Sequence, residues 1–300
     1  MGIIIKTTDL RKVYRVGGEK VVALDNINLQ IEEGTVCCIL GTSGSGKSTL
    51  LNQLAGLEKP TRGEVAIRGR RVSKMTEKEL ALFRQQSIGF VFQSYNLLPG
   101  MTAVENVALP LTFRGMRRRE RLRRAEAMLA QVGLADRKKH APSEMSGGQQ
   151  QRVGIARAFV TNPSVVFADE PTGNLDTRTT QEIMNLFLDF SRKNGTTIIL
   201  VTHDRGLAEY ADRIVTLVDG NIVNDQPNKS LYDAQQEQRE ARQAWEEDSI
   251  SPEEAQELAR QVSRATGEPP APTQHPSPAA IPPSNTANES KQPSMGGTIQ

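Results

Sequence analysis

A segment rich in glycine and hydroxyl residues, GTSGSGKST, occupies residues 41–49 and follows the apolar run TVCCIL. Glycines allow backbone N–H groups to converge on a phosphate, and the N-terminus of a following helix adds partial positive charge. The spacing matches G-x-x-x-x-G-K-[ST], in which the lysine reaches the β- and γ-phosphate oxygens and the next hydroxyl binds Mg²⁺. We therefore predict a nucleotide phosphate site formed by Gly41, Thr42, Ser43, Gly44, Ser45, Gly46, Lys47, Ser48 and Thr49.

Two adjacent carboxylates follow another apolar run. In SVVFADEPTGNLD, residues 164–176, a short β-branched stretch leads directly into Asp169 and Glu170. Ligands of parallel sheets bind beyond the carboxyl ends of the strands, so both carboxylates are expected beside the phosphate site. Asp169 is predicted to hold Mg²⁺ through water, and Glu170 is predicted to polarise an attacking water as a general base.

A second glycine-rich motif, MSGGQQQRVGIARA, occupies residues 145–158, far along the chain from the first. Ser146, Gly147, Gly148 and Gln149 open a predicted helix. Free N–H groups at a helix N-terminus attract anions, so these residues are predicted to form a second phosphate site.

These motifs and their order resemble the ATP-binding-cassette ATPases, and the resemblance covers roughly residues 3–224. It implies an ATP hydrolase that uses ATP and Mg²⁺. It further implies that Tyr14 stacks on adenine, that His203 contacts the γ-phosphate, and that the GNLD loop at 173–176 crosses a dimer interface. Gln93 is implied to link the metal and the attacking water to a membrane partner.

The roles implied for individual residues form two sets. The catalytic set is Lys47, Gln93, Glu170 and His203. The metal set is Ser48, Gln93 and Asp169.

Three segments are most similar to ATPase subunits of lipoprotein-releasing and macrolide-exporting transporters, and of a related division-associated complex. They are FQSYNLLPGMTAVENVALPL, SGGQQQRVGIARA and ADEPTGNLD. The sequence departs from that pattern at Met145, usually leucine, and at Thr42, often proline. The resemblance implies a homodimer closed by ATP that drives a separately encoded membrane permease, in export or in release of a lipoprotein or other substrate.

Two alternative functions remain open at this stage. One is a soluble cassette ATPase of translation or DNA repair, although such proteins usually carry two cassettes or zinc modules, and the sequence has one cassette and no ligand cluster. The other is a non-transporting ATPase that regulates a membrane-associated cell-wall or division complex, which sequence alone does not separate from transport.

The elements that must position these motifs alternate along the chain. Short β-branched runs at 2–6, 21–31, 35–40, 64–69, 88–92, 164–169, 196–202 and 213–223 are typical of strands. Helix-length segments at 47–56, 118–132, 146–161 and 178–193 lie between several of them. This alternation predicts an α/β fold with a largely parallel sheet. The resemblance specifies a P-loop NTPase of the cassette type, with an antiparallel N-terminal β subdomain and a helical subdomain at about 95–160.

The composition limits which partners and which cellular location are expected. The 37 basic and 35 acidic residues leave a net charge of +2, so no global field favours nucleic acid. Cys37 and Cys38 are adjacent in a strand-like run, where side chains point to opposite faces and can hardly form a structural disulfide. No run of 18 uninterrupted apolar residues occurs. We expect a cytoplasmic protein that lies on the inner face of the cell membrane through its permease.

An arginine-rich stretch, RGMRRRERLRR, covers residues 114–124. Arg114, Arg117, Arg121 and Arg124 recur at helical spacing and are expected to line one helix face. Such a face can be merely solvated, or it can contact anionic lipid or cytoplasmic loops of a permease.

The composition changes toward the C-terminus. We expect an ATPase domain at 1–225, a polar and partly helical extension at 226–265, and a disordered tail at 266–300. The last segment holds eight of the chain's 16 prolines and cannot bury enough apolar surface to order itself.

Overall fold

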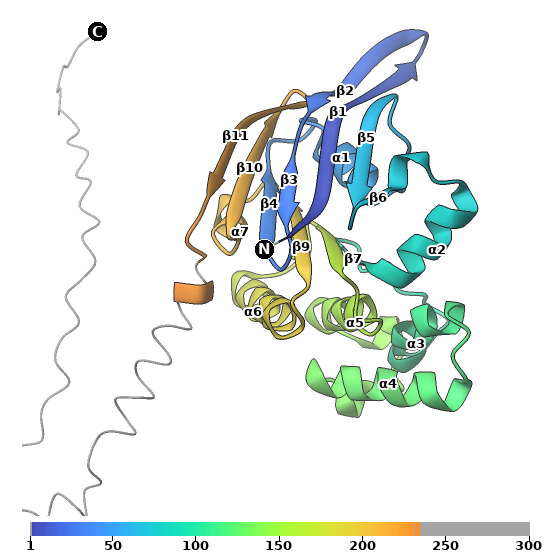
Figure 1. Cartoon of the computed structure of the whole chain (residues 1–300). Helices are drawn as coiled ribbons and strands as arrows, with labels where there is room; N and C mark the ends of the chain where they lie inside the picture. The colour runs from blue at the N-terminus through green and yellow to red at the C-terminus, as the bar shows by residue number, and fades with distance from the viewer. Residues whose placement is uncertain (1, 231, 235–300) are drawn as a thin grey trace, which may run out of the picture. The chain divides into compact units, whose positions relative to one another are not determined.

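Two β-sheets and the helices around them make up residues 2–230 and 232–234, the part of the chain that this computed structural model describes (Figure 1). The strands are β1 (Ile3–Val16), β2 (Glu19–Ile27), β3 (Gln30–Glu32), β4 (Val36–Leu40), β5 (Arg62–Ile67), β6 (Arg70–Arg71), β7 (Ile88–Phe92), β8 (Val165–Asp169), β9 (Thr197–Thr202), β10 (Arg213–Val218) and β11 (Asn221–Pro227). The α-helices are α1 (Lys47–Leu54), α2 (Glu77–Ser87), α3 (Ala103–Phe113), α4 (Arg118–Gln131), α5 (Gly147–Phe159), α6 (Thr177–Asn194) and α7 (Arg205–Ala208). Short 3-10 turns lie at Val72–Lys74, Ala135–Arg137 and Pro142–Glu144.

The larger sheet has the strand order β11-β10-β4-β9-β8-β7 and is parallel except for the β10–β11 pair. Successive residues of its strands enter two separate apolar cores, because side chains alternate across a strand. Cys37 packs in the core on one face and Cys38 in the core on the other, and both are free thiols. The alternation expected for this pair is thus observed.

The smaller sheet is antiparallel and covers one face of the parallel sheet. β1 pairs with β2, β3 and β5, and β5 pairs with β6. The apolar face of α1 shares a core with both sheets through Leu50, Leu51 and Leu54. This packing fixes the direction of α1 and therefore the direction of the loop before it.

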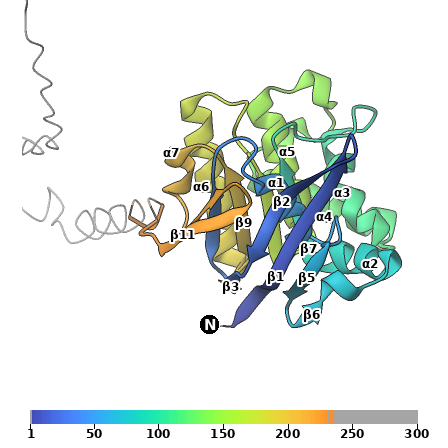
Figure 2. The same ribbon diagram turned by 90° about the horizontal axis from the view of Figure 1, so that it is seen from above.

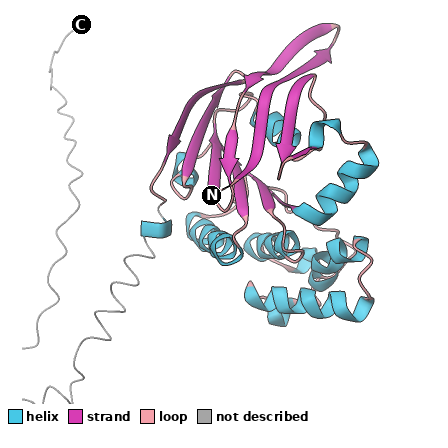
Figure 3. Ribbon diagram, viewed as in Figure 1, coloured by secondary structure: helices cyan, strands magenta, loops and turns pink. Residues whose placement is uncertain are grey.

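Helices cover the other face of the parallel sheet (Figure 3). α5 and α6 contribute Val153, Phe159 and Phe187 to a core that continues into α3 and α4. Seen from above, α2, α3 and α4 gather on one side of the body, and β11 and α7 lie on the other (Figure 2). Three helices begin with a capping box, in which the residue before the helix and the third helical residue bond each other's backbone N–H groups. The pairs are Thr76 with Glu79 in α2, Thr102 with Glu105 in α3, and Ser146 with Gln149 in α5.

The observed fold confirms the predicted class: a largely parallel α/β core, an antiparallel N-terminal part and a group of helices with no strand between β7 and β8. Some element boundaries were wrong. The run at 213–223 is two strands, because Asp219 and Gly220 both have positive φ and form a tight hairpin turn. The run at 21–31 is likewise divided between β2 and β3.

The expected arginine face is partly wrong. α3 ends at Phe113 and α4 begins at Arg118, so Arg114 lies in the connection between them. Its guanidinium donates hydrogen bonds to the carbonyl oxygens of Gln85, Gln86 and Thr161, each at 2.9 Å. Arg114 therefore ties three segments together and does not belong to the exposed face of α4.

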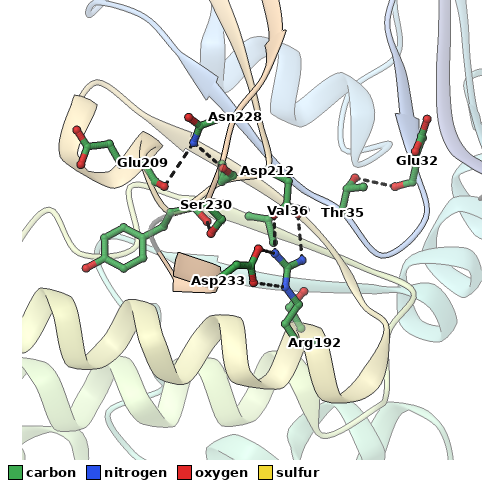
Figure 4. Close-up of polar contacts among 12 residues, drawn as sticks. Glu32, Thr35, Val36, Arg192, Glu209, Asp212, Asn228, Ser230 and Asp233 are labelled. Carbon is green, nitrogen blue, oxygen red and sulfur yellow. Dashed lines mark hydrogen bonds and ion pairs between the residues drawn. The ribbon is translucent and has the colours of Figure 1, made fainter. Parts of the chain in front are cut away.

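The chain after β11 remains attached to the body through polar contacts (Figure 4). Arg192 of α6 donates to Asp212 and, at 2.9 Å, to Asp233. Asp212 also accepts the Val36 N–H at 2.8 Å. The proposed domain boundary at 225 falls inside β11, and most of the extension at 226–265 and the whole tail at 266–300 lie outside the described residues.

Candidate nucleotide site

The glycine-rich loop runs from the end of β4 to the start of α1, as the motif predicts. Gly46 precedes the helix with φ 99° and no side chain caps the helix start. A Cβ at Gly46 would lie 2.5 Å from the Ala23 carbonyl oxygen, so only glycine fits there. Lys47 is buried and donates from Nζ to the Thr42 carbonyl oxygen at 2.7 Å. An uncapped helix start, an arched loop and a buried ammonium form a site suited to phosphate.

A cleft of about 790 Å³ opens over this loop. It brings together most residues predicted for the nucleotide, and it is lined by Tyr14, Val21, Val22, Ala23, Thr42, Ser43, Gly44, Gly46, Lys47, Ser48, Thr49, Glu170 and His203. Gly41 and Ser45 belong to the loop but do not line the cleft; Ser45 is buried, and a Cβ at Gly41 would be 2.6 Å from its Oγ. Their contribution is to the shape of the loop.

Tyr14 stands at one end of the cleft, on β1. Its hydroxyl donates to Glu58 at 2.7 Å, and Lys12 pairs with the same carboxylate at 3.1 Å. The Lys12 ammonium also lies 5.1 Å from the centre of the Tyr14 ring. Burial, followed by the bond to Glu58, raises the pKa of the Tyr14 hydroxyl, and the same bond lowers the pKa of Glu58. These contacts hold the aromatic ring in a fixed orientation.

The carboxylate pair lies at the carboxyl end of β8. Glu170 has φ 45°, a conformation that is rare for a residue with a side chain and is characteristic of functional sites. Its Oε1 lies 2.7 Å from His203 Nδ1, and this contact links the end of β8 to the end of β9. Burial, and then the adjacent Glu170, raise the pKa of Asp169, while the Lys47 ammonium lowers it. A carboxylate bonded to a histidine can accept a proton from water.

Gln93 does not line the cleft in this structure. It follows β7, and its Nε2 donates to Asn174 Oδ1 at 3.4 Å while Asn174 Nδ2 donates to the Gln93 carbonyl oxygen at 3.1 Å. Gln93 thus contacts the GNLD loop rather than the phosphate loop.

The second glycine-rich motif also lies outside the cleft, at the start of α5. Ser146 Oγ accepts the Gln149 N–H, and Gln149 Oε1 accepts the Ser146 N–H. This capping box occupies the N–H groups of Ser146 and Gln149. The N–H groups of Gly147 and Gly148 remain at a helix end that has no intrahelical partner for them.

The residues at the cleft fit a magnesium ion accompanying a nucleotide. Ser48 offers a hydroxyl in the cleft, and Asp169 lies directly before the cleft residue Glu170. Within residues 2–230 and 232–234 no group of three histidine, cysteine or acidic side chains could hold a metal alone. Mg²⁺ characteristically takes one or two protein oxygens and completes its shell with phosphates and water, so these donors suit it.

Sequence reasoning missed three residues that position the site. Glu58 orients Tyr14, Tyr95 lies against Gly147, and Arg157 binds the loop that follows Gln93. All three contacts join segments far apart in the chain. From the sequence, only Tyr95 could have been singled out, because it lies two residues after Gln93.

No helix in the described part of the chain is both long and apolar enough to cross a membrane.

Comparison with known proteins agrees with this geometry. The family model described as ABC transporter matches residues 24–173. An uncharacterized ABC transporter ATP-binding protein of Methanocaldococcus jannaschii is 50% identical over 220 residues, covering 73% of this chain and 98% of the relative. The lipoprotein-releasing system ATP-binding protein LolD of Syntrophus aciditrophicus is 47% identical over 220 residues, covering 73% of this chain and 99% of LolD.

A larger relative and a solved structure complete the comparison. The macrolide export ATP-binding/permease protein MacB of Chlorobaculum tepidum is 47% identical over 225 residues, which are 74% of this chain and 34% of MacB. The ATP-binding cassette MJ0796, solved as a dimer in a post-hydrolysis state with ADP and Pi, matches with a TM-score of 0.71 and 42% identity, covering 76% of this chain and all of MJ0796. The chain therefore belongs to the ABC transporter family, as one of its ATP-binding and ATP-hydrolysing subunits.

Proposed function

We propose that two copies of this chain close head to tail around ATP and drive a separately encoded membrane permease, in export or in release of a lipoprotein or other substrate. One observation is the main support for the proposed dimer. The cleft contains Lys47, Ser48 and Glu170, while residues 146–149 lie outside it on the same chain. A single chain therefore offers two halves of a phosphate site that do not meet, and a second copy can complete each half.

Within the cleft, each residue has a distinct task. Lys47 is assigned to the β- and γ-phosphate oxygens, and it must exchange its bond to the Thr42 carbonyl for them. Ser48 and Asp169, joined by Gln93, are the residues assigned to hold Mg²⁺. When bound, the ion neutralises charge on the phosphate oxygens. The ring of Tyr14 is assigned to the adenine face.

Proton transfer is assigned to the pair at the ends of β8 and β9. Glu170 accepts the proton of the attacking water, and His203, now bonded to Glu170, is free to turn toward the γ-phosphate because its side chain is 64% exposed. Gln93 must leave Asn174 to reach the metal and the water. Residues 146–149 of the second copy supply N–H donors to the γ-phosphate from the opposite side.

An apolar groove supports the proposal that the chain binds a membrane partner. A cavity of about 750 Å³ lies between α2, β7, α3 and α5 and is lined by residues that include Leu82, Phe90, Leu109 and Phe113. Leu82 and Phe113 are 50% and 69% exposed. We assign this groove to a cytoplasmic segment of the permease, which would place the chain on the inner face of the membrane. The names of LolD and MacB support a role in release or export.

The test of shared sites is complementation between two inactive variants. Lys47→Ala damages one half of each site and Ser146→Arg the other, so each homodimer should be nearly inactive. A mixed dimer carries both lesions in one site and leaves the other intact. Equimolar mixing should therefore restore ATP turnover, with each variant mixed with itself as the control.

Whether the two half-sites meet between chains is checked separately by crosslinking. Ser43→Cys and Gln149→Cys should crosslink between chains only with ATP, and the native cysteines should not interfere because both are buried. No recovered turnover in the mixture together with no ATP-dependent crosslink would exclude shared sites.

The groove is tested with Leu82→Glu and Phe113→Glu. Both should keep basal ATP hydrolysis, since neither residue lines the nucleotide cleft, and should lose any membrane protein that co-purifies with the unaltered chain. Unchanged co-purification would remove the groove from the proposal.

A further inference from the structure

Two consecutive residues after Gln93 adopt an unusual backbone conformation. Tyr95 has φ 61° and Asn96 has φ 48°, and both therefore lie in the left-handed region. A bulky residue such as tyrosine is a genuine outlier there, and such conformations persist only where the surrounding structure holds them. The loop that carries Gln93 must therefore be restrained by contacts outside itself.

Arg157 supplies the main restraint. It lies in the last turn of α5, and its Nη1 donates to the Asn96 carbonyl oxygen at 2.5 Å while its Nη2 donates to the Tyr95 carbonyl oxygen at 2.8 Å. The planar guanidinium presents two N–H groups in a fixed fork, so it fits two carbonyls that a left-handed turn directs the same way. A lysine at this position could satisfy only one of them with the same geometry.

The same loop contacts the opposite end of α5. A Cβ placed on Gly147, in the first turn of the helix, would lie 2.7 Å from the Tyr95 hydroxyl oxygen. The loop is therefore held at both ends of the helix that carries the second glycine-rich motif. It follows that the loop and this helix can move together.

The third contact reaches the loop after the carboxylate pair. A Cβ on Gly173 would lie 2.8 Å from Gln93 Nε2, and Asn174 bonds the Gln93 backbone and side chain. From α5, Gln151 donates to the Pro171 carbonyl oxygen. Helix α5 therefore contacts both the loop at 93–96 and the loop at 171–174, and Gln93 lies where these two loops meet. A shift of the loop at 93–96 would displace the Gln93 carboxamide.

We propose that Arg157 is a positioning residue of the ATPase, which acts by fixing the loop at 93–96 against α5 so that Gln93 is presented at a defined place. This inference rests on the proposed role of Gln93 at the metal and the attacking water. Arg157 itself touches neither the nucleotide cleft nor the carboxylate pair. Its loss should therefore act on turnover and not on ATP binding.

The experiment is a double-mutant cycle of Arg157→Met and Gln93→Ala. In the wild-type background Arg157→Met should lower kcat by about 10- to 100-fold, as expected when a catalytic group is displaced by about 1 Å. The Kd for a fluorescent ATP analogue should stay within about twofold. In the Gln93→Ala background Arg157→Met should lower kcat by no more than about twofold, since the group that it positions is already absent.

A matched control comes from the same helix. Arg152 donates to the Val132 carbonyl oxygen and to Glu182, so Arg152→Met also removes two hydrogen bonds of α5 without touching the loop at 93–96. It should leave kcat unchanged. If Arg157→Met does not fold, Arg157→Lys takes its place in the same cycle, with a smaller loss of kcat expected.

Two results would overturn the inference, and they differ from failure of the proposed function. An unchanged kcat in the Arg157 variant, or an equal loss in both backgrounds, would show that Arg157 does not act through Gln93. If Gln93→Ala alone left kcat unchanged, the role of Gln93 would fail instead. Hydrogen exchange of the peptide covering 93–101 should be faster in the Arg157 variant than in the Arg152 variant, and equal rates would contradict the restraint.

Discussion

Replacing Glu170 with glutamine separates ATP binding from hydrolysis. The carboxamide has the same size as the carboxylate and can still bond His203, which lies 2.7 Å away. The Glu170 side chain is 22% exposed, and the substitution exchanges one carboxylate oxygen for a nitrogen without adding bulk. Folding should therefore be preserved, with the free energy of unfolding changed by less than about 1 kcal/mol.

The effect on chemistry should be large. A lost general base slows a reaction by about 10²- to 10⁴-fold, which raises the activation free energy by about 3–5 kcal/mol. Binding should survive, because the negative charge of Glu170 raises the pKa of Asp169. Removing that charge lowers the pKa of Asp169, so Asp169, the carboxylate assigned to Mg²⁺, stays ionised to a lower pH. ATP should bind and then remain bound in a closed dimer.

The assay combines steady-state ATP hydrolysis, equilibrium binding of ATP, and size-exclusion chromatography with ATP and Mg²⁺. Turnover should fall at least about 100-fold, and the variant should elute as a dimer with ATP and as a monomer without it. Glu209→Gln, an exposed carboxylate at the end of α7, serves as the control and should hydrolyse ATP normally. Near-normal turnover of Glu170→Gln would refute the assignment of the base.

Three further outcomes follow from the described contacts. Tyr14→Ala should weaken ATP binding by about 1–2 kcal/mol with little loss of maximal rate, while Tyr14→Phe keeps the ring and most of the affinity; titration with a fluorescent ATP analogue decides. Arg192→Met should lower the free energy of unfolding by about 1–3 kcal/mol, because the half-buried Asp212 loses its ion pair and keeps only the Val36 N–H; unchanged thermal unfolding would contradict this. Burial raises the pKa of Cys37 to about 12 and also raises that of Cys38, so neither thiol should react with a disulfide reagent at about pH 8 until the protein is denatured.

The predicted fold was correct where it depended on local patterns. β-branched runs bounded by turn residues mark the strands of the parallel sheet, and the alternation of strand and helix predicts its parallel direction. The errors also have local causes. An Asp-Gly turn inside the run at 213–223 could have been recognised as a hairpin, and the T-x-x-E patterns at Thr76 and Thr102 could have revealed α2 and α3, which lie in none of the predicted helical segments.

The phosphate site could be predicted from the sequence because it is a local structure. Gly46, Lys47 and Ser48 are neighbours in the chain, and a short loop between a strand and a helix needs only its own glycines and the helix end to form an anion site. The acidic pair at Asp169 and Glu170 could be predicted in the same way, from its place at the end of a buried strand. Their assigned roles remain predictions.

The tertiary structure decided which distant groups meet. Glu170 contacts His203 across 33 positions, Gln93 contacts Asn174 across 81, and Arg157 reaches Tyr95 across 62. No periodicity encodes such pairs, because each depends on the register of the sheet and on the packing of α5 beneath it. The sequence by itself thus determined the elements and the phosphate loop. Only the folded chain could bring Glu170 to His203, tie the Gln93 loop to α5, and leave the second glycine-rich motif outside the cleft, since those outcomes arise from packing between segments and not from residues adjacent in the chain.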